Sequence, residues 1–461
     1  MSTYIKARGT TATEWQRPAD WIAIPTTSPG EQVFYGLVAV YDVADGNRVA
    51  FTFSGNYTVD WGDGSALENV LSGVKAEHSY NYASVSNTTT EGWRQALIKV
   101  IPTGAANITT VNLQQTPTGI AVGKISQFVD IVMSIPNVTG GGNLVIGAGA
   151  TVFHRIVQRI WIKEIGAINT MATMFQNCSS LQSVPLFNTS SVTTMQLMFD
   201  RCSSLQSVPL FNTVSVTTMN SMFSSCTLLK SVPLFNTASV TVMQNMFQLC
   251  TSLESIPLFN TASVLSMANM FNGCISLKSI PLFNTVNVTT MQAIFTSCTS
   301  LKSVPLFNTV SVTNMLQMFV NCTLLESVPL FNTANVTNMQ QMFSNCIVLK
   351  SVPSFNTANV SNMSQMFSGT SSIYEVEFNM ASTTILGLMF QSIGSLQRFI
   401  ATGLTRGITI SNNLMSETEL NNFFTSLGTA SGAQTIVVTG NPGAATCNVL
   451  IATAKGFTVT I

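Results

Sequence analysis

The feature that most constrains this chain is an internal repeat of 24 residues. Prolines from Pro185 to Pro353 and phenylalanines from Phe187 to Phe355 recur at that step. Cysteines keep the same spacing eight times, at positions 178, 202, 226, 250, 274, 298, 322 and 346. A fixed period of about 20–50 residues is typical of solenoids, in which each unit buries its apolar face only against its neighbours. The repeat therefore predicts an array of stacked coils.

Each repeat contains two hydrophobic patterns. The first, L-x-x-V-x-L from residue 181 to residue 186, predicts a short, half-buried strand with Leu186 facing inward. The second, V-x-x-M-x-x-M-F from residue 192 to residue 199, predicts a two-turn helix with Ser191 at its N-cap. The sequence thus predicts an α/β repeat solenoid that is leucine-rich-repeat-like, with short parallel strands plus short helices.

The second pattern carries a family resemblance. Residues 312–322 read V-T-N-M-L-Q-M-F-V-N-C, and residues 336–346 read V-T-N-M-Q-Q-M-F-S-N-C. These segments resemble the hallmark of the BspA-type leucine-rich repeats of bacterial surface proteins, and the resemblance covers about residues 165 to 400. It implies surface exposure and adhesion rather than one activity. The chain departs from that family in having proline where it commonly has aspartate, and in a shorter following turn.

The proline row bears on the strands. Pro185 and its seven equivalents lie inside the predicted strand, and proline has no N–H to donate to a ladder. We therefore expect very short strands and a stack held mainly by the Leu, Val, Met and Phe rows. No long ladder should pass through Pro209, Pro233 or Pro257.

Two other rows are expected inside the stack. The cysteines lack the C-x-x-C spacing of metal sites, so they are predicted to be small buried residues and not ligands. The start of the chain lacks the apolar segment of a signal peptide, so nine free thiols are expected. The asparagine row that begins at Asn188 is expected to form an internal amide ladder that caps the backbone of the turns.

One row is expected to face outward because it follows the inward leucine. Its charged members form the candidate binding row: Lys230, Glu254, Lys278, Lys302, Glu326 and Lys350. Opposite charges on neighbouring strands attract, each pair by about 0.2–1 kcal/mol. Two interpretations stay open, a ligand-binding stripe and a device that controls the register of the parallel strands.

Residues 1–102 differ in kind from the repeats. They hold β-like runs, the segment W-G-D-G at residues 61–64 and H-S-Y at residues 78–80. This set resembles a PKD-type, immunoglobulin-like all-β domain, used as a spacer on extracellular and virion proteins. Asp60 and Asp63 are candidate calcium ligands, although in that family the aspartate more often braces the turn. His78 is expected to pack in a strand.

The remaining boundaries follow from where the repeat is regular. Residues 103–170, with Gly140 to Gly142, are expected to be an irregular linker and the N-terminal cap of the solenoid. Residues 171–370 hold the eight repeats. Residues 371–461 hold degenerate repeats and a C-terminal cap, with helices at 417–427 and around Cys447 and strands at 435–438 and near Phe457.

The sequence offers little chemistry. Only two histidines occur, His78 and His154, and the catalytic motifs of hydrolases, kinases and metalloproteases are missing. Net charge is zero and only 8% of residues are charged, which excludes a phosphate-binding surface for nucleic acid. No apolar run is long enough to span a membrane. We therefore expect no enzyme, no cofactor and no metal.

The leading functional hypothesis is a structural or binding protein of a bacteriophage virion, such as a tail fibre, a receptor-binding protein or a capsid-surface fibre. It is expected to contact other virion proteins and a host glycan or protein receptor, as a homo-oligomer (dimer or trimer). The order of PKD-like domain and repeats resembles proteins of marine and gut bacteriophages. The alternative is a bacterial cell-surface adhesin exported by a non-classical route; an ice-binding face is disfavoured because no regular T-x-T row exists.

Overall fold

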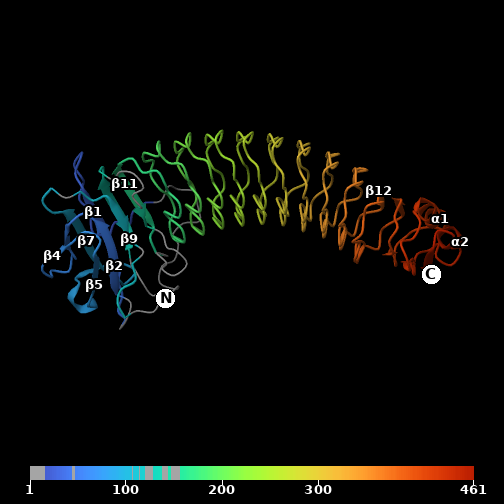
Figure 1. The fold of residues 1–461 in the computed structure, drawn as a ribbon. Helices are drawn as coiled ribbons and strands as arrows, with labels where there is room; N and C mark the ends of the chain where they lie inside the picture. The colour runs from blue at the N-terminus through green and yellow to red at the C-terminus, as the bar shows by residue number, and fades with distance from the viewer. Residues whose placement is uncertain are drawn as a thin grey trace. The chain divides into compact units, whose positions relative to one another are not determined.

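The computed structural model describes residues 16–43, 47–105, 107–113, 115–119, 128–137, 144–146 and 156–461. The chain forms two compact units, Met1–Ser239 and Val240–Ile461. The first unit holds a β-sandwich followed by stacked coils. The second holds further coils and a closing cap, as Figure 1 shows along the colour gradient.

Two sheets make the sandwich of the first unit. The larger has the order β11-β9-β1-β7-β3-β4, with β6 paired to β7, and the smaller has the order β10-β8-β2-β5. The larger sheet consists of β1 (Val33–Val40), β3 (Tyr57–Asp60), β4 (Glu68–Val70), β6 (Asn87–Thr88), β7 (Arg94–Pro102), β9 (Phe128–Ile135) and β11 (Arg159–Ile165). The smaller consists of β2 (Arg48–Ser54), β5 (Lys75–Ser79), β8 (Thr110–Asn112) and β10 (Leu144–Val145), and a 3-10 turn, η1 (Tyr82–Ser84), follows β5.

The sandwich core lies between the two sheets. Phe34 of β1 contacts Phe51 and Phe53 of β2, with ring centroids 6.2 and 5.4 Å apart. Every residue of β1 and β9 is buried, as expected for central strands covered on both faces. The N-terminal part is thus all-β, and its PKD-like identity stays a prediction.

The structure corrects the expectation of an irregular linker at residues 103–170. Four strands, β8, β9, β10 and β11, lie in this range, and β9 pairs with β1 in the larger sheet. The run F-V-D-I-V-M-S-I from residue 128 is buried throughout, and burial on both faces produces a near-continuous apolar strand. The sandwich therefore extends to residue 165, well beyond residue 102. Gly140 to Gly142 lie outside the described residues.

The predicted helix of each repeat is wrong. Between residues 171 and 370, all of which the structure describes, the chain makes overlapping turns and no α-helix. Asp200 N–H donates to the carbonyl of Leu197 (3.2 Å), and Leu197 and Arg201 have φ of 57° and 62°. Backbone in this left-handed region interrupts a right-handed helix.

Coil spacing explains the difference. Alternate N–H groups of a coil donate to the next one: Leu197 to Asn220 O at 2.9 Å, and Phe199 to Met222 O at 2.9 Å. The rings of Phe199 and Phe223 stack 5.6 Å apart. A helix is about 10–12 Å wide with its side chains, so it cannot recur at this spacing in every coil. Flat turns can.

The first pattern of each repeat also differs from a regular strand. In the described coils the first pattern carries only isolated parallel bridges, Arg159↔Ser183 and Ser351↔Glu375, so very short strand pairing is confirmed. In that part of the chain no ladder passes through Pro209, Pro233 or Pro257. The prediction that Leu186 faces inward is wrong: it is 63% exposed.

A three-residue turn accounts for the exposure of the equivalent leucines from Leu210 onward. In coil after coil the N–H of phenylalanine donates to the carbonyl of the proline two residues earlier, for example Phe307 to Pro305 at 2.9 Å. Such an i→i+2 bond makes a γ-turn, and the intervening leucine lies at its apex. The phenylalanine is buried, and the leucine points to solvent.

The predicted N-cap row takes another role. At the position equivalent to Ser191, the hydroxyl of Ser311 donates to the carbonyl of Val286 (2.7 Å), and the amide of Asn335 donates to Val310 O (2.8 Å). These side chains therefore join successive coils, where the sequence predicted helix caps.

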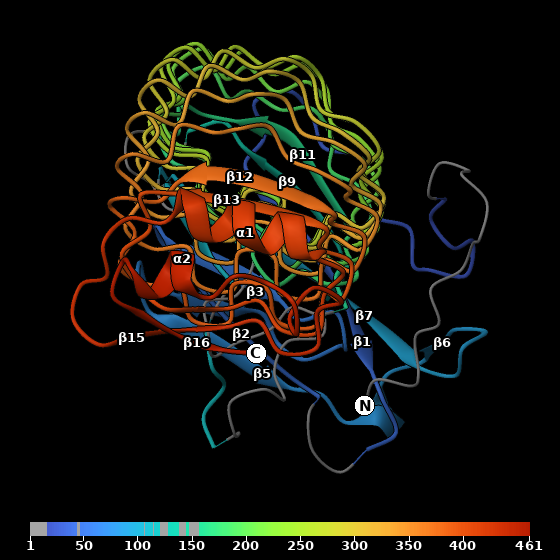
Figure 2. The same cartoon turned by 90° about the vertical axis from the view of Figure 1, so that its right-hand side faces the viewer.

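The second unit ends in a cap (Figure 2). It comprises β12 (Glu375–Asn379), β13 (Arg398–Thr402), β14 (Ile408–Thr409), α1 (Glu417–Ser426), β15 (Gln434–Val437), α2 (Leu450–Thr453) and β16 (Phe457–Thr460). The N-cap of helix α1 is Ser416, whose hydroxyl accepts from Glu419 N–H. The helix buries Leu420, Phe423 and Phe424. The expected helix at 417–427 and both strands are present, whereas the helix expected around Cys447 begins only at Leu450.

Candidate binding surface

The candidate binding row is exposed in both units. Lys230 lies in the first unit, and Glu254, Lys278, Lys302, Glu326 and Lys350 lie in the second. Each follows a fully buried leucine, which places its side chain outward as the alternation predicts.

The charges of this row pair only once among the residues that the structure describes. Lys302 Nζ lies 2.9 Å from Glu326 Oε1, with the side chains 65% and 61% exposed. An ion pair this exposed contributes at most about 1 kcal/mol. The backbone beside it, where Glu326 N–H donates to Lys302 O at 2.9 Å, holds the register directly.

The candidate binding row continues into the cap with residues that the sequence patterns did not indicate. Tyr374 N–H donates to Lys350 O (3.0 Å), and its side chain is exposed. One strand later, Arg398 lies 3.5 Å from Glu375 and 3.2 Å from Glu377. These charges neutralise one another at the surface and do not form a cluster that could hold a metal ion.

A second exposed row, the leucine row, is formed by the apices of the Pro-Leu-Phe turns. Its members are Leu186, Leu210 and Leu234 in the first unit and Leu258, Leu282, Leu306 and Leu330 in the second, each 58–63% exposed. Val286 and Val310 are also exposed, four residues after a row leucine. Contiguous exposed apolar surface usually marks an interaction site. The sequence repeat contained this row, but the inward prediction for Leu186 concealed it.

The polar residues next to the leucine row stabilise the coils. Asn308 is exposed, and its Oδ1 accepts from Val310 N–H (3.1 Å), while the buried Thr309 hydroxyl donates to Asn332 O in the next coil (2.7 Å). The predicted capping of the turn backbone by the asparagine row is therefore confirmed, and the predicted internal amide ladder is wrong because these asparagines are exposed. A short amide ladder occurs elsewhere, from Gln317 to Gln341 (2.7 Å).

The cysteines of the repeat are buried donors. Cys298 Sγ donates to the carbonyl of Phe271 at 3.1 Å, and where the row ends, Thr370 Oγ1 makes the same bond to Phe343 O at 2.6 Å. All nine cysteines are thiols in the structure. Burial raises the pKa of Cys178 and Cys322 to about 12, so the reactive thiolate is disfavoured.

The two candidate calcium ligands brace a turn. Asp60 Oδ1 accepts from Gly62 N–H (3.0 Å), and Asp63 Oδ1 accepts from Ser65 N–H (3.1 Å). Asp63 Oδ2 lies 2.8 Å from His78 Nε2, and His78 stacks on Trp61. Burial acts to raise the pKa of Asp63, but the bonds from Ser65 and His78 outweigh it and lower the pKa. Both carboxylates are thus used within the turn.

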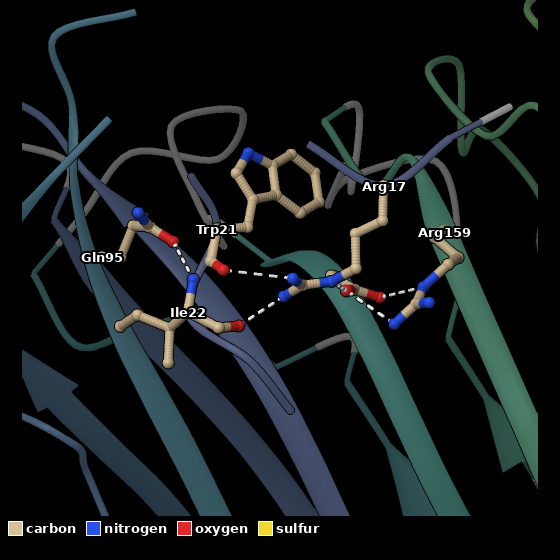
Figure 3. A network of polar contacts seen from close by, with 6 residues as sticks. Arg17, Trp21, Ile22, Gln95 and Arg159 are labelled. Carbon is tan, nitrogen blue, oxygen red and sulfur yellow. Dashed lines mark hydrogen bonds and ion pairs between the residues drawn. The ribbon is translucent and has the colours of Figure 1, made fainter. Parts of the chain in front are cut away.

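A buried ion network in the sandwich was not indicated by the sequence (Figure 3). Asp130 of β9 is fully buried, and its carboxylate lies 2.7 Å from Arg17 Nε and 2.7 Å from Arg159 Nε. Arg17 also donates to the carbonyls of Trp21 and Ile22. The network fastens the segment that begins at residue 16 and strand β11 to β9, so its role is structural.

The described residues contain no group of three or more His, Cys, Asp or Glu side chains placed to hold a metal ion. His154 lies outside the described part of the chain. No described helix has the length and apolar character needed to cross a membrane. What the arrangement offers is two exposed rows on a stacked scaffold.

Comparison with known proteins gives a family for the coils. Residues 153–255, 229–325 and 300–402 match the family described as "Mycoplasma protein of unknown function, DUF285"; together the matches cover more than half of the 461 residues. An internalin (inlF) from Listeria monocytogenes str. 4b F2365 is 10% identical, with 72% of this chain and 86% of that chain covered. Its TM-score of 0.22 is too low to carry an argument. No curated protein shows significant sequence similarity.

Proposed function

The chain belongs to the DUF285 family, and on that premise we propose that it is a non-enzymatic binding protein that engages a protein partner through its leucine row. The observation that carries the proposal is the regular exposure of one leucine at the apex of each Pro-Leu-Phe turn. Fully burying an exposed leucine contributes about 1.5–3 kcal/mol, so four leucines in one unit can supply much of a binding energy.

The chemistry of the row favours a protein partner over a glycan. Sugar hydroxyls must stay hydrogen-bonded when they lose water, and aliphatic side chains offer them no partner. An apolar protein surface has no such hydrogen bonds to water and therefore loses none when it is buried. Because few charges lie nearby, association should depend weakly on salt.

The BspA-type resemblance of residues 312–322 and 336–346 supports display at a surface, either that of a bacterial cell or that of a bacteriophage virion. The sandwich of the first unit then serves as a spacer on the side of the cell or particle. Antibodies against the full chain distinguish the two locations. Labelling of intact virions supports a fibre or receptor-binding protein, and labelling of intact cells supports an adhesin. Labelling of neither contradicts surface display.

A peptide-display selection tests the binding surface. The full chain is immobilised, and binders are selected from a random dodecapeptide library. We expect apolar peptides whose affinity falls at least tenfold when the four row leucines of the second unit, Leu258, Leu282, Leu306 and Leu330, are changed to serine. Tenfold corresponds to about 1.4 kcal/mol, less than the burial of one leucine.

The matched control changes Lys278, Lys302, Glu326 and Lys350 to serine. This variant should bind the selected peptides as the unchanged chain does. If the peptides instead lose affinity only for this control, the charged row is the binding surface and the proposal is wrong. Incubation of the chain with bacterial envelope glycans tests the non-enzymatic part, because released fragments would contradict it.

A further inference from the structure

We propose that a cleft in the cap of the second unit binds an extended peptide by strand addition. The cleft lies where the stack of turns stops, between residues 388–394 and strand β14. It is separate from the leucine row, so this inference goes beyond the proposed function and stands or falls independently of it.

The first wall of the cleft is a row of backbone donors without acceptors. In the preceding coil, four alternate N–H groups donate to the next coil at 2.8–3.0 Å: Met363, Gln365, Phe367 and Gly369 to the carbonyls of Ile385, Gly387, Met389 and Gln391. The equivalent groups of that next coil belong to Leu386, Leu388, Phe390 and Ser392. Within the part of the chain that the structure describes, none of these four N–H groups has an acceptor.

The second wall is the free edge of β14. Strand β14 pairs with β15 in parallel, and the residues that follow it continue this pairing: Ile410 N–H donates to Val437 O (2.9 Å) and Asn412 N–H donates to Thr439 O (2.8 Å). Because backbone groups alternate along a strand, Thr409 and Ser411 turn theirs to the opposite edge. Both residues line the cleft, but the carbonyl of Ser411 already accepts from Asn413 Nδ2 (3.0 Å), so among the described residues Thr409 is the one that offers an unpaired backbone edge opposite the donor row.

The space between the walls has the size of a ligand site. Its volume is 520 Å³, within the range of about 300–1,000 Å³ that small-ligand sites occupy. Every lining residue is uncharged, which disfavours a free ion as the occupant.

The molecule itself shows which occupant fits the donor row. In each preceding coil of this unit the four equivalent N–H groups donate to the carbonyls of alternate residues in one segment of the next coil. An extended peptide supplies acceptors at that spacing and has its other edge free for β14. This is the chemistry of strand addition, in which main-chain bonds provide the affinity. Leu386 and Phe390 are buried and Leu388 and Ser392 are exposed, and an extended peptide gives all four N–H groups an acceptor.

Hydrogen exchange of the full chain, followed by mass spectrometry, tests the proposal. The probe is a peptide of residues 361–370 with both termini blocked. In the intact chain this segment supplies the equivalent carbonyl acceptors to the coil before it, residues 339–345. In the free chain we expect residues 386–394 to exchange much faster than residues 363–369. With the peptide at a concentration 100 times its Kd, exchange of residues 386–394 should slow by about 100-fold.

Two variants complete the design. Ser411→Trp places a large side chain in the cleft and should abolish the protection, whereas Thr418→Trp, on exposed helix α1 outside the cleft, should retain it. Slow exchange of residues 386–394 in the free, unchanged chain would overturn the proposal without any variant. Equal protection by inorganic phosphate, or peptide protection that survives Ser411→Trp, would also overturn it.

Discussion

Asp130 offers the sharpest test of what holds the sandwich together. Its carboxylate is fully buried and pairs with Arg17 and Arg159, whose side chains are 21% and 24% exposed. Removing one partner of a buried ion pair typically costs about 3–5 kcal/mol. Because both guanidinium groups reach solvent and can rehydrate, we expect Asp130→Asn to cost about 3 kcal/mol, at the low end of that range.

Tryptophan fluorescence in urea measures this cost selectively. All five tryptophans lie between residues 15 and 161, in the first unit and before its regular coils. With a slope of about 2 kcal/mol per molar urea, the midpoint of Asp130→Asn should fall by about 1.5 M.

A double-mutant cycle separates the ion network from simple loss of packing. Arg159→Met leaves Asp130 paired with Arg17, so we expect a smaller cost of about 1–2 kcal/mol. Once Asp130 is Asn, Arg159 has lost its anion, and the double variant should cost at least about 1 kcal/mol less than the two single costs added together. Additive costs, or a midpoint for Asp130→Asn within about 0.3 M of the unchanged chain, would refute this account.

Further expected outcomes follow from the coils. Thr370→Cys should change the free energy of unfolding, measured by circular dichroism, by less than about 1 kcal/mol because either side chain can donate to the same carbonyl, whereas Thr370→Ala should cost about 1–2 kcal/mol. Lys302→Ala should cost less than about 1 kcal/mol in the same assay, since its ion pair is exposed. A thiol reagent should label only Cys447 in the native chain and all nine cysteines in denaturant; fewer than nine would reveal disulfides. Folding raises the pKa of Cys178 to about 12. The free energy of unfolding should therefore be unaffected by this thiol below its unfolded pKa of about 9 and should fall above it, by about 1.4 kcal/mol at pH 10, and Cys178→Ser should lessen that fall.

The period alone determined much of this protein. A 24-residue step means that equivalent residues share one environment, so the buried Cys, Leu, Val, Met and Phe rows and the exposed row from Lys230 to Lys350 could be predicted before any coordinates. The proline row likewise predicted that no long ladder forms. The strong apolar pattern also predicted helix α1, because a local cap at Ser416 and a periodic face are both visible in the sequence.

The period does not say how each coil is folded. The pattern at residues 192–199 fits one face of a helix and fits a run of flat turns equally well, and only the contact between coils decides between them. In the structure alternate N–H groups leave the coil, as with Leu197 to Asn220, and a helix would keep them inside. The exposure of Leu210 and its later equivalents has the same origin, since it depends on whether Pro-Leu-Phe extends as a strand or closes as a γ-turn.

Tertiary structure alone also decided the parts without a repeat. Strand β9 and its partner β11 come from a region whose surroundings suggested a linker, and nothing in the sequence joins Arg17 to Asp130, 113 residues away. The cleft beside β14 exists because the next segment of chain continues toward α1 and supplies no further acceptors to the turns. The hydrogen-bond partners of these backbone groups come from segments far away in the sequence, so a local sequence pattern cannot predict them.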